Sequence, residues 1–372
     1  TGLTGVSAWT QYTADLSNYA DQEVVIVFKG TSNWGYNDAY IYLDDVRIAV
    51  VETFTKGITG YGDSENGGYY LIASPLADAI TPATGNGFIT NDYDLYYFDQ
   101  SAADDLEWIN FKDETDGGYT IGNGKGYLYA SQANTTLTFT GVPYSGDGTV
   151  ALDYDEDADL TGWNLVGNPF NVTAYPGREF YVMNPDGRAE IIAATDNSVE
   201  PMEGIFVIAD EGETSMTFST THAAKGSMVS LNVSKANRLE DRAIVRFGNG
   251  GMLPKYQLRQ NSTKVYIPQE GKDYAVVSAG QVGEMPVNFK AAKNGSYTMG
   301  FTSEEVTFSY LHLVDNMTGI ETNLLETPYY TFDARTTDYE SRFRLVFATG
   351  SSLDGDTFGF VNAAGNLTIF GI

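Results

Sequence analysis

Gly68-Tyr-Tyr-Leu-Ile-Ala-Ser-Pro-Leu76 recurs further along the chain as Gly162-Trp-Asn-Leu-Val-Gly-Asn-Pro-Phe170. In both stretches a glycine comes before an aromatic residue and a short, mainly apolar run, and a proline follows. A bounded apolar run of about four to eight residues is typical of a buried strand, and proline ends it because it cannot donate to a backbone ladder. The stretch therefore predicts the same β-strand twice.

Three more elements recur in the same order, which indicates an internal duplication and not a chance match. They pair as follows: Leu95–Asp99 with Phe180–Asn184, Gly126–Ala130 with Gly204–Ile208, and Leu137–Thr140 with Met216–Ser219. The copies lie at about 66–141 and 160–222, and the first copy has the longer loop, at 99–117.

A unit of four strands leaves one face of its sheet open. We therefore expect the two copies to pack together across a pseudo-twofold axis, as one sandwich or as two abutting barrels. Tyr69 and Trp163 should then occupy equivalent buried positions, because each follows the glycine that opens its copy. Truncating Trp163 should destabilise residues 51–224 and leave residues 225–350 almost unaffected.

Composition supports an all-β fold of tandem β-sandwich or jelly-roll modules. The 372 residues include 40 glycines, 26 tyrosines and 20 phenylalanines but only 19% charged residues, a profile that suits short strands and tight turns. Cysteine is absent, which excludes disulfides and thiol chemistry. No apolar run approaches the roughly 20 residues of a membrane-spanning helix, so membrane insertion is not expected.

The net charge of −28 is concentrated in the first two-thirds of the chain. Residues 1–224 hold 7 Lys/Arg and 34 Asp/Glu, whereas residues 225–350 hold 14 and 13. A surface this acidic repels the phosphates of nucleic acid and anionic lipid, so no nucleic-acid partner is expected. The acidity would attract divalent cations, or it would simply keep an exported protein soluble, and the second explanation requires no site.

Residues 1–50 read as the terminal strands of a module. Val24–Lys29 is a β-branched and aromatic run, and Tyr40–Ile48 is an apolar strand that encloses an acidic pair. These strands and the one near Trp9 cannot cover both faces of a sheet, so their partners should lie upstream or on another chain. We expect the chain to be the C-terminal portion of something longer.

Trp9, Leu16, the Val-x-Ile-x-Phe pattern at 24–28 and the Leu-Asp-Asp-Val step at 43–46 resemble the end of the cleaved-adhesin domains (gingipain and hemagglutinin K-type) of secreted Bacteroidetes proteins. The resemblance implies a jelly roll in which a carboxylate of the final strand ligates a structural Ca²⁺, a role that would fall to Asp45 or Asp44, with a slight preference for Asp45. The alternative is that one aspartate faces water and the other caps a turn.

Residues 225–350 again show alternation, for example at 229–233 and 297–301. The succession Leu311–Gly319 (L-x-L-x-D-x-x-T-G) and Arg342–Phe347 (R-F-x-L-x-F) resembles the immunoglobulin-like module that precedes a type IX secretion sorting domain. Residues 351–372 resemble the opening strands of that sorting domain. The resemblance implies a protein secreted to, or held at, the outer-membrane surface of a Gram-negative bacterium. Arg342–Phe347 is expected to be a final strand with an edge of basic residues.

Few residues qualify as a metal or catalytic site. Asp153, Asp155 and Asp157 imitate an EF-hand loop, but Ala158 stands where the loop needs glycine and Asn164 where it needs glutamate. A weaker surface Ca²⁺ site and a solvated acidic loop both remain open.

The two histidines, His222 and His312, lack the neighbours of known catalytic motifs and are expected to be structural or surface residues. His312 should point away from Leu311 and Leu313. Trp34 and Tyr36 could stack on a sugar ring or contact a protein, although most such aromatics in tightly turned β-proteins belong to the core.

These observations lead to two hypotheses. The first is a non-enzymatic, secreted or cell-surface adhesin or structural module that binds a host or bacterial surface protein, a glycan, or another copy of itself. The second is an accessory C-terminal region of an exported protease or glycoside hydrolase whose catalytic domain lies upstream of Thr1.

Overall fold

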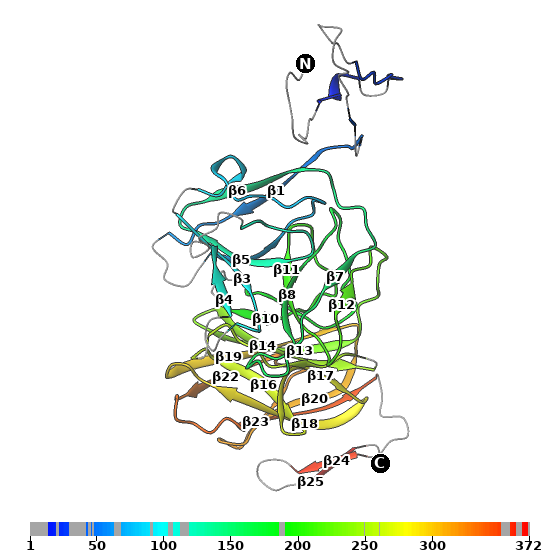
Figure 1. The fold of residues 1–372 in the computed structure, drawn as a ribbon. Helices are drawn as coiled ribbons and strands as arrows, with labels where there is room; N and C mark the ends of the chain where they lie inside the picture. The colour runs from blue at the N-terminus through cyan, green and yellow to red at the C-terminus, as the bar shows by residue number, and fades with distance from the viewer. Residues whose placement is uncertain are drawn as a thin grey trace, which may run out of the picture. The chain divides into compact units, whose positions relative to one another are not determined.

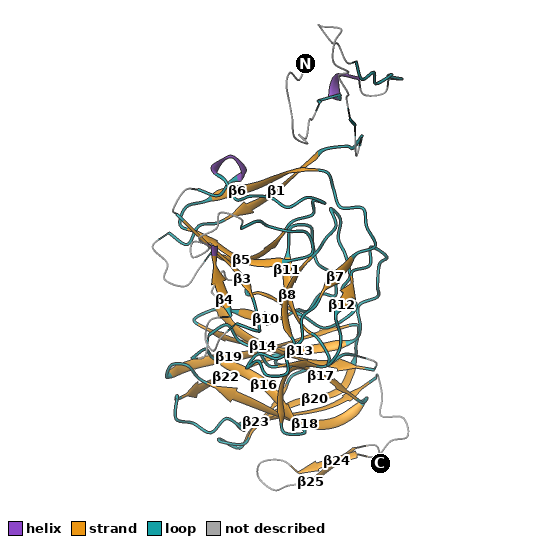
Figure 2. Ribbon diagram, viewed as in Figure 1, coloured by secondary structure: helices purple, strands orange, loops and turns teal. Residues whose placement is uncertain are grey.

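The computed structural model describes residues 14–19, 22–29, 42, 43, 46, 48–62, 68–89, 92–102, 107–111, 119–185, 190–248, 250–259, 261–350, 358–361 and 367–370. Within these ranges the chain forms strands and two short 3-10 turns, Ser17–Tyr19 (η1) and Thr84–Asn86 (η2), and no α-helix (Figures 1 and 2). The all-β prediction is confirmed. None of the described segments forms a helix long and apolar enough to cross a membrane. The chain divides into two compact units, 1–49 and 50–372.

Two consecutive segments of the larger unit have the same strand order. The first contains β1 (Glu52–Ile58), β2 (Tyr69–Ala73), β3 (Tyr93–Phe98), β4 (Trp108–Asn110), β5 (Gly126–Ser131) and β6 (Thr135–Gly141). The second contains β7 (Thr149–Ala151), β8 (Trp163–Gly167), β9 (Tyr181–Met183), β10 (Ile191–Ala193), β11 (Gly204–Ile208) and β12 (Ser215–Thr217). Their antiparallel sheets run β2-β5-β3-β4 and β8-β11-β9-β10, and β1–β6 and β7–β12 form separate pairs. We call the two segments repeat 1 and repeat 2.

The register of the two sheets also agrees. In repeat 1, Tyr69 lies opposite Ala130 and Ala73 opposite Gly126. In repeat 2, the first residue of β8 lies opposite the last residue of β11, and the last residue of β8 lies opposite Gly204, the first residue of β11. β2 and β8 therefore each end beside the glycine that begins the partner strand.

The repeats contact each other through reciprocal backbone hydrogen bonds. The Ala73 amide of repeat 1 donates to the Met202 carbonyl of repeat 2 at 3.2 Å, and the equivalent Gly167 amide donates to the Gly124 carbonyl at 3.0 Å. Both acceptors have positive φ, 63° at Met202 and 73° at Gly124. Such pairwise exchange of equivalent bonds is what a twofold relation produces.

The remaining large sheet is mixed and nearly closed. It contains β13 (Met228–Lys235), β14 (Arg238–Phe247), β15 (Leu253–Pro254), β16 (Lys264–Gln269), β17 (Lys272–Ala279), β18 (Val282–Lys290), β19 (Gly295–Glu304), β20 (Phe308–Asp315), β21 (Ile320–Asn323), β22 (Tyr329–Ala334) and β23 (Phe343–Thr349). The order is β21-β20-β23-β18-β16-β17-β14-β13-β19-β22, with β15 paired to β17. Only β14 and β17 are parallel neighbours among its pairs. We call this sheet the barrel.

Alternation along the strands places one set of side chains inside the barrel and another on its outer face. The inner core includes Leu231, Val245, Val277 and Phe289. On the outer face Ile244, Val276 and their neighbours pack against both repeats, in a core that contains Leu71 and Leu128 of repeat 1 and Trp163, Leu165 and Phe206 of repeat 2. The repeats and the barrel therefore share a hydrophobic core, which we call the shared core.

Trp163 is buried, as predicted, while Tyr69 is only partly buried, and both belong to the shared core. The Trp163 ring lies 4.6 Å from the ring of Tyr256, which follows β15 of the barrel. Truncating Trp163 would open a cavity against this part of the chain, so the packing favours an effect on residues 225–350 where the sequence predicts almost none.

Polar contacts reinforce the boundary between repeat 2 and the barrel. Arg246 of β14 forms a two-point ion pair with Glu179, with both nitrogen–oxygen distances at 3.0 Å, and both side chains are largely buried. Arg242 of the same strand donates to the Ala193 carbonyl at 3.0 Å. These bonds fix the repeat against the strand face that it covers.

The described residues of the smaller unit contain no strand. Residues 23–29 have no ladder partner there, so the strand predicted at Val24–Lys29 is not formed. Their apolar side chains are exposed, as is shown by Val25 at 85% and Val27 at 76%. A strand needs a neighbour for its backbone groups, and none of the described residues supplies one.

Near the other end of the chain, β24 (Phe358–Val361) and β25 (Leu367–Phe370) pair as an antiparallel hairpin.

Candidate binding site

A pocket of about 550 Å³ opens at one end of the barrel. Three of the residues that line it end strands of the barrel: Phe247 ends β14, Ala279 ends β17 and Thr349 ends β23. Val306 comes from the loop between β19 and β20. The volume lies in the range of small-ligand sites, about 300–1,000 Å³.

The apolar wall of the pocket is rigidly supported. The Phe247 ring packs edge-on against Phe308 at 5.4 Å and against Phe347 at 5.3 Å, and both supporting rings belong to the inner core. Val306 and Ala279 pack against the same core. One aromatic ring thus faces the pocket while two others hold it in place.

The polar wall consists of uncharged side chains. The Ser227 hydroxyl donates to the Glu305 carbonyl at 2.6 Å, and the Ser278 hydroxyl donates to the Gly250 carbonyl. Each hydroxyl has a single proton, so its oxygen remains available as an acceptor. Gln281 is exposed at the rim, and its backbone carbonyl accepts a hydrogen bond from the Thr349 backbone amide at 2.8 Å. None of the described residues that line the pocket is charged.

The acidic loop is organised by a buried glutamine and not by the carboxylates. Gln100, which follows β3, is 3% exposed. Its amide nitrogen donates to the carbonyls of Asp153 and Trp163, and its oxygen accepts from the amides of Asp155 and Gly162. Gln100 thereby ties repeat 1 to the loop between β7 and β8 of repeat 2.

The three aspartates of this loop do not converge. The Asp155 carboxylate accepts from the Asp157 amide at 3.1 Å, which closes a turn, while Asp153 and Asp157 are exposed. Among the described residues no group of three or more His, Asp or Glu side chains is arranged to hold a metal ion. Asp44 and Asp45, the preferred calcium ligands, and Trp34 and Tyr36, the suggested ligand-stacking residues, lie outside the described residues.

Neither histidine lies at the pocket. His312 points to the face opposite Leu311 and Leu313, as predicted, where it stacks on Tyr310 at 3.9 Å and its Nδ1 lies 2.8 Å from the Glu321 carboxylate. His222 is exposed and lies against the Tyr175 ring at 5.4 Å.

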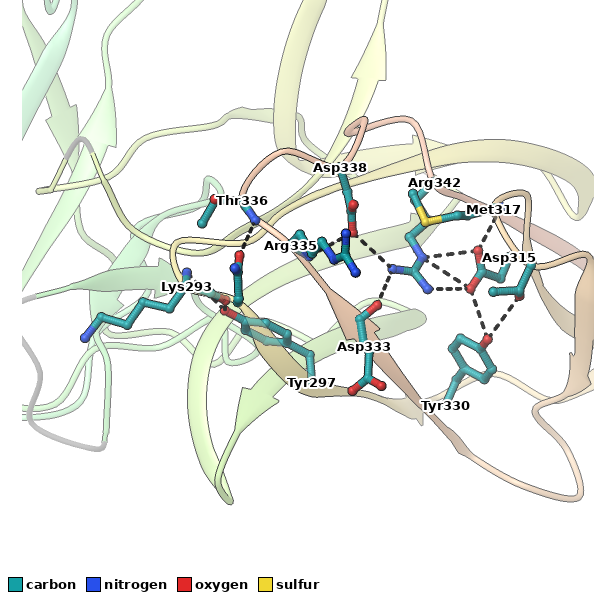
Figure 3. A network of polar contacts seen from close by, with 12 residues as sticks. Lys293, Tyr297, Asp315, Met317, Tyr330, Asp333, Arg335, Thr336, Asp338 and Arg342 are labelled. Carbon is teal, nitrogen blue, oxygen red and sulfur yellow. Dashed lines mark hydrogen bonds and ion pairs between the residues drawn. The ribbon is translucent and has the colours of Figure 1, made fainter.

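A buried ion pair closes the seam of the barrel (Figure 3). Arg342 donates to both Asp315 oxygens, the shortest contact being 2.8 Å, and its other terminal nitrogen donates to the Asp333 carbonyl of β22, also at 2.8 Å. The guanidinium lies 4.6 Å from the centre of the Phe332 ring, and Tyr330 donates to Asp315 at 3.0 Å. The Arg342 side chain therefore links β20, which is next to one end of the sheet order, to the backbone of β22 at the other end.

This arrangement corrects the expectation of a basic edge. Arg342 is 2% exposed and precedes β23, and it does not lie on an exposed strand edge. Burial alone would raise the pKa of Asp315, but the bonds from Arg342 lower it below its ordinary value. The signal was present in the sequence, because Asp315 is the aspartate of the D-x-x-T-G pattern and Arg342 the arginine of R-F-x-L-x-F.

A second buried acidic group lies where repeat 2 meets the barrel. Glu190 is 8% exposed, accepts from the Ser262 hydroxyl, and has no hydrogen-bond partner among the described residues for its second oxygen. Burial raises its pKa to about 7, and the nearby Asp241 raises it further while Arg259 and Lys255 oppose the shift. Lys255 forms its own ion pair with Asp241, with a nitrogen–oxygen distance of 2.6 Å. Sequence reasoning missed this group because nothing local to Glu190 marks it as buried.

Comparison with protein-family models, with curated proteins and with solved structures gave no match.

Proposed function

We propose that this chain is a non-catalytic binding region of a secreted or outer-membrane surface protein, an adhesin-type module that holds a surface protein or glycan at the mouth of its barrel. The observation that carries the proposal is the pocket lined by Phe247, Ser278 and Gln281, which is open and supported by the inner core and has no charged side chain among its described lining residues. A concave site that combines apolar surface with placed hydrogen-bonding groups is typical of ligand binding.

The finer architecture belongs to the same proposal. Repeats 1 and 2 would be a duplicated β-module, residues 225–350 an immunoglobulin-like module, residues 351–372 the start of a sorting domain, and residues 1–50 the end of a calcium-bound jelly roll. The matched sheet orders support the duplication. The shared core supports a single rigid body that presents the pocket at a fixed position.

The test is binding of the purified chain to host and bacterial cell surfaces, measured by flow cytometry, with a variant that fills the pocket. Gly280 lines the pocket, and a Cβ atom added there would meet no atom within 4 Å. Gly280→Trp should therefore place a bulky ring at the mouth of the pocket without straining the backbone. Gly85→Trp is the matched control, because Gly85 is equally open but lies in η2 of repeat 1. Loss of binding in the first variant alone is expected, and equal binding by both variants would contradict the proposal.

The second candidate is an accessory region of an exported protease or glycoside hydrolase. It is favoured by the exposed apolar run at 24–28, which needs a cover that the described residues do not supply. A catalytic domain upstream of Thr1 in the precursor would favour this candidate, whereas further jelly-roll copies there would favour the adhesin.

A further inference from the structure

We propose that the pocket at the mouth of the barrel takes a neutral sugar residue; this assignment rests on the proposed function and names the ligand of that same site. The first argument is charge. None of the described residues lining the pocket is ionisable, so a charged ligand would lose its hydration there without gaining an opposite charge.

The hydrogen-bonding groups of the pocket match hydroxyl groups on the ligand. The hydroxyl protons of Ser227 and Ser278 are already donated to backbone carbonyls within the barrel, which leaves their oxygens as acceptors. A ligand must therefore bring donors to this wall, and a sugar brings several. The Gln281 amide at the rim can both donate and accept, which suits a hydroxyl that does the same.

The opposite wall suits the C–H face of a sugar ring. Phe247 is half-buried and held edge-on by Phe308 and Phe347, so it presents apolar surface without needing to rearrange. Val306 and Ala279 extend this surface. A sugar ring has an apolar C–H face and polar hydroxyl edges. The Phe247 ring would contact the apolar face, and the serine oxygens on the opposite wall would accept hydrogen bonds from the hydroxyl groups.

A peptide fits this lining less well. An apolar side chain would cover the serine oxygens without bringing them a donor, and a buried polar group without a partner is unfavourable. A charged side chain would find no counter-charge among the described lining residues. The open rim at Gly248 and Gly280, both exposed, leaves room for the rest of a glycan outside the pocket.

The experiment is saturation-transfer NMR with the full chain and a panel of neutral oligosaccharides ending in galactose, glucose, mannose or N-acetylglucosamine. At least one sugar should receive saturation on its ring C–H protons, and Gly280→Trp should abolish the signal while Gly85→Trp retains it. Phe247→Leu keeps an apolar side chain against the core but removes the ring, and it should weaken the affinity about threefold to tenfold. Gln281→Ala, at an exposed position, should also weaken it.

The outcomes separate this inference from the proposed function. If no sugar in the panel binds, or if binding survives Gly280→Trp, the sugar assignment is overturned. Should Gly280→Trp still abolish attachment to cells in that case, the binding function stands and its ligand is another class, such as a peptide. Attachment that is unchanged in Gly280→Trp overturns the proposed function itself.

Discussion

A Cβ atom added to Gly204 would lie 3.3 Å from the Cα atom of Gly126, so the two repeats meet backbone to backbone at this pair of equivalent glycines. Gly126 begins β5 and lies opposite the last residue of β2, and Gly204 begins β11 and lies opposite the last residue of β8. The sequence similarity between the repeats therefore has a spatial counterpart at the place where they touch.

Replacing Gly126 with alanine should destabilise the fold. The new Cβ would lie 2.7 Å from the Val166 carbonyl oxygen of repeat 2, so the repeats would have to separate. Overpacking of this kind costs about 1–3 kcal/mol, measurable as a lower urea midpoint. Gly57→Ala on β1 is the control, since its Cβ would meet no atom within 4 Å. Equal midpoints for the two variants would show that the contact carries no strain.

Trp163→Ala should loosen the barrel as well as repeat 2. Truncating a buried indole typically costs about 3–5 kcal/mol, and the cavity would open toward Tyr256. Hydrogen exchange followed by mass spectrometry should show faster exchange in β14 and β17 in addition to β8. Tyr339→Ala, at a residue 50% exposed, should leave all three strands unchanged. Faster exchange confined to β8 would mean that the shared core does not couple the two parts.

The ion pair at the barrel seam should be costly to break. Asp315→Asn leaves the buried Arg342 guanidinium with only the Asp338 carboxylate, at 4.0 Å, as a counter-charge. Removing the partner of a buried charge typically costs about 3–5 kcal/mol, and the loss should approach this range. Glu284→Gln removes a more exposed pair, with Arg344 at 3.0 Å, and should cost less than about 1 kcal/mol. Urea unfolding at pH 7 separates the two variants, and similar losses in both would contradict a structural role for the buried pair.

Asp315 should also make the stability of the barrel seam sensitive to acid. Because the folded-state pKa of Asp315 is lowered, its stabilisation is present above the unfolded-state pKa, near 4, and is lost as the pH falls through the lower folded-state pKa. Wild-type stability should decline below about pH 4 more steeply than that of Asp315→Asn. Parallel declines would exclude Asp315 as a source of acid sensitivity.

Glu190 should make the stability depend on pH in the opposite direction, with a loss of stability as the pH rises. Its pKa is raised from 4.5 to about 7 in the folded chain. Its contribution to the free energy of unfolding is therefore fully present below pH 4.5 and is lost as the pH rises through 7. Ionisation of this buried group then costs on the order of 3 kcal/mol. The stability of Glu190→Gln should change little with pH across this window, and the variant should be more stable than wild type above pH 7. Glu326→Gln, at an exposed position, should follow the wild-type curve; a Glu190→Gln curve that does the same would refute the assignment.

Ca²⁺ should stabilise the chain through Asp45 or Asp44. An ion that binds only the folded state adds about 2.7 kcal/mol at one hundred times its dissociation constant. Thermal unfolding in excess EDTA, followed by restoration of Ca²⁺, measures the effect. Asp45→Asn should reduce it and Asp155→Asn should not, because Asp155 closes a turn. An unchanged melting temperature would leave the acidity as a means of solubility alone.

Local patterns in the sequence predicted what is local in the structure. The strands that end before Pro75 and Pro169 form as expected, because a bounded apolar run and a proline act within a few residues. β7 was missed because a strand of three residues, Thr149–Ala151, gives no periodic signal. Its membership in repeat 2 follows only from its pairing with β12, far along the chain.

Long-range features could not be predicted in this way. The parallel pairing of β14 with β17 joins strands that the sequence does not mark as neighbours. The pocket is assembled from the ends of β14, β17 and β23, so no motif announces it. The Arg342–Phe347 pattern predicts a basic strand edge, and only the approach of Asp315 makes the burial of Arg342 favourable.

The position of β23 determines how the barrel responds to a mechanical load. β23 lies between β20 and β18, and both pairings are antiparallel, with hydrogen bonds that run perpendicular to the strand. Tension applied to the chain beyond Gly350 and directed along β23 would load both ladders in shear, so many bonds would have to break together and not one after another. Under flow, the rate of forced unfolding would then be set by this strand, while the pocket whose rim includes Thr349 would keep its shape until that strand gives way.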